Sequence, residues 1–284
     1  KKVWAASGLD PENPPKTYEG FIDALKKIKQ AGFTPYVIGM KDGYWADFFS
    51  SPMGAQFYDN ISQLRSAILG VTSLAAAPNN GWWKVVQDMR DLKLFNDDAM
   101  SLSLGEVMDV FAAGNAGFTN AVQPQAVYAA SILGAENVGV MVPPVPSKTK
   151  LAGYCAIPTN PLIIPAKAKY PEEAGKFLEF AVSKERQMAM YQSTGAMPIS
   201  DLIDPSIMKT GYDKTTIDIV LKKPTFTYQE SIPVAVLESM YSICQELVGG
   251  SINADEAAAK FEKAAARWRQ DYPEEVKNYK NIGK

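Results

Sequence analysis

The sequence predicts an α/β fold, because amphipathic helices are followed by short apolar segments that suit buried strands. One helix–strand pair and one further strand carry this prediction. A helix over residues 17–31 precedes a strand over 35–39, and Gly114 turns the chain into a second buried strand that ends near Asn120. The chain has 284 residues, enough for one large or two medium α/β domains.

The helix over 17–31 has clear boundaries. Thr17 suits an N-cap position, and Gly32 suits the end of the helix. Phe21, Leu25 and Ile28 recur at helical spacing and predict one buried face.

The strand over 35–39 leads into a predicted loop, residues 41–51. Loops at the carboxyl ends of strands are where ligands bind in open α/β sheets. Asp42, Tyr44 and Trp45 supply a carboxylate and two rings to this loop. One interpretation is sugar recognition, with a ring on the apolar sugar face and the acid accepting from hydroxyls. The alternative is that Trp45 anchors its own loop on the core.

Two later segments supply further candidates. Trp82 and Trp83 open a helix, and its periodicity places Trp83 in a core stripe, which leaves Trp82 as a weaker candidate for ligand contact. Asn120 and Gln123, at the end of the predicted strand, could hydrogen-bond a ligand. Strands are also predicted over 138–145 and 154–157. Tyr154 begins the second, where ligand contact and core packing are equal alternatives.

The carboxyl-terminal half is mainly helical. Helices are predicted from Pro171 and from Ser183, a loop-rich stretch after Pro198, and a solvated tail near the end. A later helix has an apolar stripe formed by Val234, Leu237, Tyr241, Cys244 and Val248. An Asn253-x-x-Glu256 capping box starts the next helix.

Four polar residues near this stripe are candidate ligands for hydroxyl groups. Tyr228, Gln229 and Glu230 lie on the loop before the helix, and Glu238 lies one position off the stripe. A charge beside a core stripe is usually only solvated, and that interpretation is favoured for Glu238.

Composition excludes several classes of site. The sequence has no histidine, which removes His-based catalytic triads and His zinc sites, so no metal or cofactor is expected. The net charge of -2 gives no basic excess for nucleic acid. Cys155 and Cys244 lack CxxC spacing, so two buried thiols are favoured over a disulfide.

Several motifs occur in the order typical of one family. They are GLDPENPPKTYEGF near the start, FAAGNAGF at 111–118, YPEEAGKFLEFAVSKERQ at 170–187, STGAMP at 193–198 and VLESMYSICQELVGGSINADEAAAKF at 236–261. This series resembles the extracellular solute-binding proteins of sugar-type ABC importers, the maltose-binding-protein-like group. The family usually has Gly-x-Trp after the strand at Asn120. Here Ala121-Val122-Gln123-Pro124 stands instead, so the usual stacking Trp is missing.

The resemblance implies a periplasmic-binding-protein-like II fold, with two α/β lobes joined by a hinge. Residues 1–150 and 200–284 would form the carboxyl-terminal lobe, and 151–199 would belong to the amino-terminal lobe. The first residues resemble a segment well inside the family's proteins, so most of the amino-terminal lobe is expected to be absent from this chain.

The implied function is capture of a mono- or oligosaccharide between the lobes and its delivery to an ABC permease. The expected protein is a non-enzymatic monomer, periplasmic or extracellular, and a surface lipoprotein in a Gram-positive bacterium. Alternative ligands are a glycerol phosphate ester, a polyamine or a metal chelate. A glycoside hydrolase is a further alternative, with Asp42, Glu230 and Glu238 as candidate carboxylates.

Overall fold

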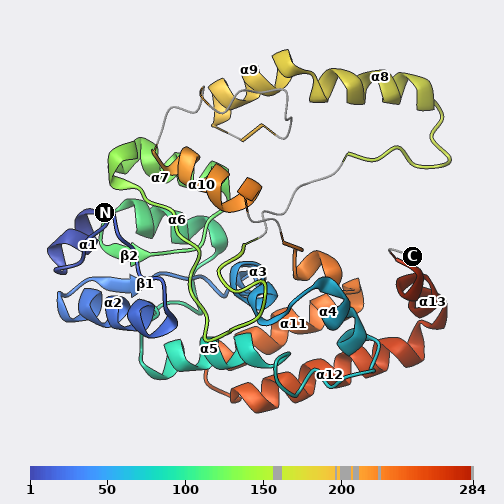
Figure 1. Ribbon diagram of the computed structural model, residues 1–284, viewed down its shortest axis with the longest axis horizontal. Coiled ribbons are helices and arrows are strands. Elements are labelled where there is room, and N and C mark those ends of the chain that lie inside the picture. Colours follow the sequence, from blue (N-terminus) through green and yellow to red (C-terminus); the bar gives the residue numbers. More distant parts are fainter. Residues whose placement is uncertain (156–161, 196, 199–205, 207–210, 223–224, 283–284) are drawn as a thin grey trace.

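The computed structural model describes residues 1–155, 162–195, 197–198, 206, 211–222 and 225–282. In this part of the chain, helices surround a small sheet, and α8 extends away from the main body (Figure 1). The helices are α1 Lys2–Ala6, α2 Tyr18–Gln30, α3 Trp45–Met53, α4 Ile61–Ile68, α5 Gly81–Asp91, α6 Leu104–Ala112, α7 Gln123–Leu133, α8 Pro171–Val182, α9 Lys184–Thr194, α10 Gly211–Lys222, α11 Val234–Val248, α12 Ala254–Asp271 and α13 Pro273–Asn281. The strands are β1 Thr34–Tyr36 and β2 Ala116–Phe118, and the 3-10 helices are η1 Gly54–Phe57, η2 Ala135–Asn137 and η4 Gln229–Ser231.

The two strands pair in parallel. Thr34 pairs with Ala116 and Tyr36 with Phe118, and a parallel bridge from Tyr36 to Phe95 extends the sheet. Parallel pairing requires a long crossover, which the helices between β1 and β2 provide. The predicted strands at 35–39 and before Asn120 are therefore confirmed in position, although both ladders are short.

Helix α2 forms as its sequence predicts. The Thr17 side chain accepts an amide hydrogen bond from the first turn, and Gly32 adopts a φ of +86° just beyond the helix. Phe21, Leu25 and Ile28 are all buried. A residue with a side chain would be strained at such a φ, so glycine suits this helix end.

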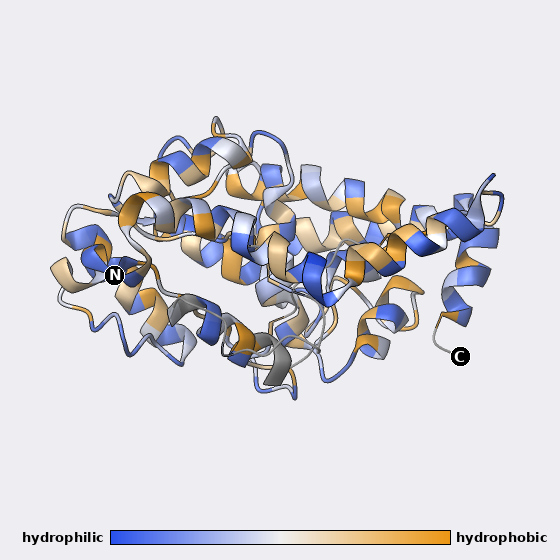
Figure 2. Ribbon diagram, turned by 90° about the horizontal axis from the view of Figure 1, so that it is seen from above, coloured by the Kyte–Doolittle hydropathy of each residue, from blue (hydrophilic) through white to orange (hydrophobic). Residues whose placement is uncertain are grey.

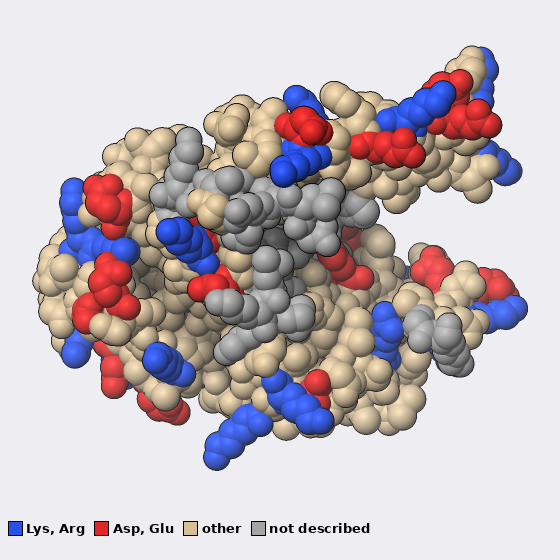
Figure 3. Space-filling view, turned by 45° about the horizontal axis from the view of Figure 1, so that its top comes forward, with Lys and Arg blue, Asp and Glu red and all other residues tan. Residues whose placement is uncertain are grey.

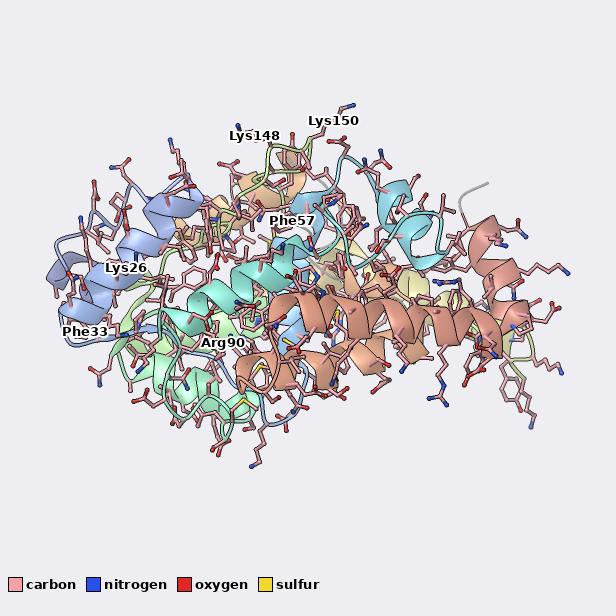
Figure 4. The ribbon with its side chains drawn as sticks, turned by 90° about the horizontal axis from the view of Figure 1, so that it is seen from below. Lys26, Phe33, Phe57, Arg90, Lys148 and Lys150 are labelled. Carbon is pink, nitrogen blue, oxygen red and sulfur yellow. The ribbon has the colours of Figure 1, made fainter. Side chains whose placement is uncertain are left out.

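Helices α5, α11 and α12 pack together on the side of the body away from α8 (Figure 1). The predicted capping box is confirmed: Asn253 and Glu256 exchange side-chain to backbone hydrogen bonds. Arg90 of α5 donates to the carbonyl oxygens of Leu247 at 2.7 Å and Ile252 at 2.9 Å (Figure 4). These two hydrogen bonds connect the turn between α11 and α12 to α5.

Five segments differ from the prediction. The expected loop over 41–51 contains α3 from Trp45 onward, because Gly43, with a φ of +75°, turns the chain early. Residues 138–145 form no strand, since their prolines remove ladder donors. Tyr154 and Cys155 are not in a strand, and the rest of that predicted strand lies outside the described residues. Helices α10 and α13 replace the expected loop and tail.

The buried face of α11 is rotated from the predicted stripe. Cys244 and Val248 of the predicted stripe are buried, but so are Val236, Met240, Ile243 and Leu247, whereas Val234 is 72% exposed. The reason is that α11 packs against α12 on one side and against α3 and α5 on others. Several partners widen the buried face beyond a single stripe.

Helix α8, which is described along its whole length, has no buried residue. Phe177 and Phe180 are each 59% exposed. The space-filling view shows α8 projecting from the body and carrying side chains of both charges (Figure 3). Most helices mix apolar and polar residues (Figure 2), and within the described ranges none has the length and apolar character needed to cross a membrane.

Candidate functional site

The candidate site lies where β1 leads into α3. After β1 the chain stays extended: the Val37 amide donates to Phe118 O at 3.0 Å, and the Met40 amide donates to Ala99 O at 2.8 Å. Gly43 then turns the chain into α3. The first turn of α3 therefore stands at the carboxyl end of the sheet, the edge where open α/β sheets bind ligands.

Five side chains gather around this first turn, and we call them the α3 cluster: Tyr44, Asp47, Glu230, Glu238 and Tyr241. The Tyr241 hydroxyl donates to Asp47 Oδ2 at 2.8 Å. The Tyr44 ring is 54% exposed and meets the Tyr241 ring edge-on, with 5.4 Å between ring centroids. Glu230 and Glu238 are exposed, and both act electrostatically on Asp47.

The carboxylates of the α3 cluster influence one another. The pKa of Asp47 is raised to about 6, mainly by burial and also by the negative charges of Glu230 and Glu238, while the hydrogen bond from Tyr241 lowers it. Burial, followed by the bond to Asp47, raises the pKa of Tyr241. At neutral pH the cluster is therefore acidic, with a tyrosine hydroxyl that stays protonated.

Trp45 and Asn120 lie on the inner side of α3. Asn120 accepts a hydrogen bond from the Tyr36 hydroxyl at 2.7 Å and donates one to the Phe48 carbonyl. Trp45 is 1% exposed and stacks on the Phe48 ring, with 4.9 Å between centroids. A ligand would reach Trp45 only if its ring left the core. This placement favours the alternative in which Trp45 anchors its own segment.

Trp82, Tyr228 and Gln229 are also buried. Trp82 stacks on Trp83 at 3.8 Å, and the Tyr228 ring meets Trp82 edge-on at 6.1 Å. Burial raises the pKa of Tyr228 to about 12. The structure thus places these aromatic candidates in the core rather than on the surface beside Tyr44.

The remaining candidates lie outside the α3 cluster. Asp42 is exposed, and its Oδ2 accepts from the Leu104 amide at 3.1 Å, so it supports the start of α6. The Gln123 side-chain oxygen, Oε1, accepts from the Met197 amide. Tyr154 is half-buried at the end of the segment that passes α3. As ligand residues, all three stay predictions.

Sequence reasoning missed two members of the cluster. Tyr241 was assigned to an apolar stripe, and Asp47 lay in a segment expected to be a loop. A helix beginning at Trp45 would have placed Tyr44 and Asp47 three residues apart on one face, which is the signal that was available.

The two cysteines are separate thiols. Cys155 and Cys244, both among the described residues, form no disulfide. Burial raises the pKa of Cys155 to about 12 and that of Cys244 as well. Among the residues that the structure describes, no group of three His, Cys, Asp or Glu side chains could hold a metal ion.

Comparison with known sequences identifies one matching family and one curated relative. The profile of the family described as bacterial extracellular solute-binding protein matches residues 1–188. The chain is 24% identical over 260 residues to the sn-glycerol-3-phosphate-binding periplasmic protein UgpB of Salmonella paratyphi A. That alignment covers 87% of this chain and 57% of the relative, so the chain spans little more than half the length of UgpB.

Solved structures of similar fold cover nearly the whole chain. A chitin oligosaccharide binding protein matches with a TM-score of 0.79 and 20% identity, over 95% of this chain and 68% of that one. A sugar transporter from Bacillus licheniformis, in complex with stachyose, matches with a TM-score of 0.73 and 17% identity, over 94% of this chain and 69% of that one. At these identities the likeness establishes the fold, and it confirms the predicted α/β class.

Proposed function

This chain belongs to the bacterial extracellular solute-binding protein family, and from that premise we propose that it captures a carbohydrate for an ABC importer and delivers it to the membrane permease. Its fold is the predicted periplasmic-binding-protein-like one. Proteins of this family serve transport rather than catalysis. The mature protein would act in the periplasm or outside the cell, on a lipid anchor in a Gram-positive bacterium.

The observation that carries the carbohydrate proposal is the half-exposed Tyr44 ring beside acidic side chains at the carboxyl end of β1. A sugar has apolar faces that suit such a ring and hydroxyls that donate to carboxylates. Buried hydroxyls without partners would cost about 1–3 kcal/mol each, so acceptors must lie close to the ring. Glu230 and Glu238, whose charges act on Asp47 three residues after Tyr44, are the acceptors that we propose.

A glycerol phosphate ester is the second candidate ligand, because the curated relative is named for sn-glycerol-3-phosphate. A phosphate is best bound by Arg, Lys or a helix N-terminus. The α3 cluster instead contains three carboxylates and no basic residue. Repulsion between these carboxylates and a phosphate favours a neutral sugar at this surface.

Two further alternatives share the acidic character of the cluster. A polyamine would place its ammonium groups beside Asp47, Glu230 and Glu238. A glycoside hydrolase would need two carboxylates across the sugar, about 5–10 Å apart. Turnover of an aryl glycoside that is lost in Glu230→Gln or Glu238→Gln would support the enzyme.

We propose the two-lobe organisation as well, with 1–150 and 200–284 in one lobe and 151–199 in the other. The absence of buried residues in α8 supports it, because the exposed rings of Phe177 and Phe180 suit packing against more of a second lobe. Hinge closure would then let both lobes contact the ligand.

A thermal-shift screen tests the ligand class. The panel is stachyose, chitotetraose, galactose, sn-glycerol-3-phosphate and spermidine. A ligand at 100 times its Kd stabilises the folded state by about 2.7 kcal/mol. We expect a sugar to raise the melting temperature, and we expect this increase to be smaller in Tyr44→Ala. Tyr272→Ala, whose ring is similarly exposed at 46%, is the control and should keep the increase. A shift only with the phosphate or with spermidine would contradict the carbohydrate proposal.

A further inference from the structure

Helix α11 holds the loop that presents the candidate ligand residues. Gln245 Nε2 donates to Met40 O at 2.6 Å and lies 3.4 Å from Lys41 O. Tyr241, one turn earlier on the same face of α11, donates to Asp47. Two adjacent side chains of α11 therefore contact the β1–α3 loop, residues 37–44, at Met40 and Lys41, and the first turn of α3 at Asp47.

Gly43, near the end of this loop, also lies against α11. Gly43 has a φ of +75°, and a Cβ added there would lie 3.2 Å from the Tyr241 Cβ. The backbone thus approaches α11 as closely as a glycine allows. Tyr44 follows directly, and its ring meets the Tyr241 ring edge-on. The position of the Tyr44 ring is set by α11 rather than by the loop alone.

We propose that Tyr241 and Gln245 are positioning residues for ligand binding, which fix the β1–α3 loop so that Asp42 and Tyr44 face the ligand in one arrangement. The inference rests on the proposed solute-binding function. It assigns to α11 a role that does not require either residue to touch the ligand. Loosening either contact would leave the loop more mobile and the ligand site less ordered.

The ionisation of Asp47 reports on the same contact. The groups that act on its carboxylate are Tyr241 and Glu238 of α11 and Glu230 of η4. The charge of Asp47 in turn helps to raise the pKa of the buried Cys244 thiol of α11. The Tyr241 hydrogen bond stabilises the ionised form of Asp47. Removing that hydroxyl should therefore raise the pKa of Asp47 above about 6.

The test compares Tyr241→Phe and Gln245→Ala with Tyr18→Phe in the full chain. Tyr18→Phe is a matched control, because the Tyr18 hydroxyl donates to Asp88 at 2.9 Å between α2 and α5, away from this loop. Amide hydrogen exchange is measured at Gly43, whose amide donates to Met40 O at 3.2 Å. The affinity for stachyose and the carboxyl carbon-13 titration of Asp47 are measured alongside.

We expect exchange at Gly43 to become about tenfold faster in Tyr241→Phe and in Gln245→Ala, and to stay unchanged in Tyr18→Phe. The pKa of Asp47 should rise in Tyr241→Phe only, and stachyose should bind about fivefold more weakly in both loop variants. Equal exchange in all three variants would overturn the inference. If stachyose fails to bind even the unmodified chain, the choice of sugar is wrong, and the exchange and titration data still decide whether α11 positions the loop.

Discussion

The Tyr36 hydroxyl donates to the Asn120 side-chain oxygen across 2.7 Å, and both residues lie in the core at the end of the sheet. Asn120 also donates to the Phe48 carbonyl of α3. One amide thus joins β1, β2 and α3. Because the oxygen and the nitrogen of this side-chain amide both hydrogen-bond within the protein, we assign Asn120 a structural role, which is to hold α3 at the edge of the sheet.

Replacing Asn120 by Ala should lower the free energy of unfolding by about 1–3 kcal/mol, because the Tyr36 hydroxyl would stay buried without a partner. Urea denaturation measures the loss. In the Tyr36→Phe background no hydroxyl is left unpaired, so the same Asn120 change should cost less there. Equal losses in the two backgrounds would contradict this account.

Local signals explain why part of the fold could be predicted. Thr17 marks the start of α2 and Gly32 its end, and the Asn253–Glu256 pair marks the start of α12. Each of these signals acts between residues that are close in sequence. Such contacts depend only on neighbouring sequence, so caps and helical periodicity are sufficient to find them. The family motifs then supplied the arrangement of these elements.

The site could be predicted only in part, because its contacts are distant in sequence. Tyr241 and Asp47 are 194 residues apart, and no local pattern pairs them. Tyr44, one of the predicted ligand residues, has an exposed ring. Trp45, its neighbour, had the same sequence signal, yet α3 begins at Trp45 and its ring is buried against Phe48, because a helix rather than the expected loop sets its direction.

Trp45→Ala should be strongly destabilising. The sugar-recognition interpretation of Trp45 instead predicts weaker sugar binding without unfolding. Its ring is 1% exposed, and removing a buried Trp typically costs about 3–5 kcal/mol. Tyr44→Ala, at an exposed position, should change the unfolding free energy by no more than about 0.5 kcal/mol. Thermal and urea unfolding of both variants test the contrast. A Trp45→Ala protein as stable as Tyr44→Ala would restore the ligand interpretation.

Asp47→Asn should change the pH dependence of stability. The folded-state pKa of Asp47 is about 6, above its ordinary value of 3.8, so the folded protein binds more protons between these pH values. Asp47 therefore makes the unfolding free energy fall as the pH rises from about 4 to about 7, by about 1 kcal/mol once its solvent exposure is included.

The Asn side chain can still accept from Tyr241 but does not titrate, so the difference between the two proteins isolates Asp47. Urea denaturation across this pH range measures it. Glu238→Gln removes one charge that raises the pKa of Asp47. The unfolding free energy of this variant should therefore decrease less as the pH rises from about 4 to about 7. Parallel profiles for the unmodified chain and Asp47→Asn would show that Asp47 titrates normally.

The double variant Phe177→Ser/Phe180→Ser should leave the unfolding free energy of this chain unchanged within about 0.5 kcal/mol. Both rings are 59% exposed, and α8 buries none of its residues, so their removal opens no cavity. Phe261→Ala in α12, where the ring is 0% exposed, should cost about 3–5 kcal/mol in the same assay. A loss above about 1 kcal/mol in the double variant would mean that α8 packs on the body of this chain. No loss would leave these rings available to the second lobe that we propose, because both are largely exposed in this chain.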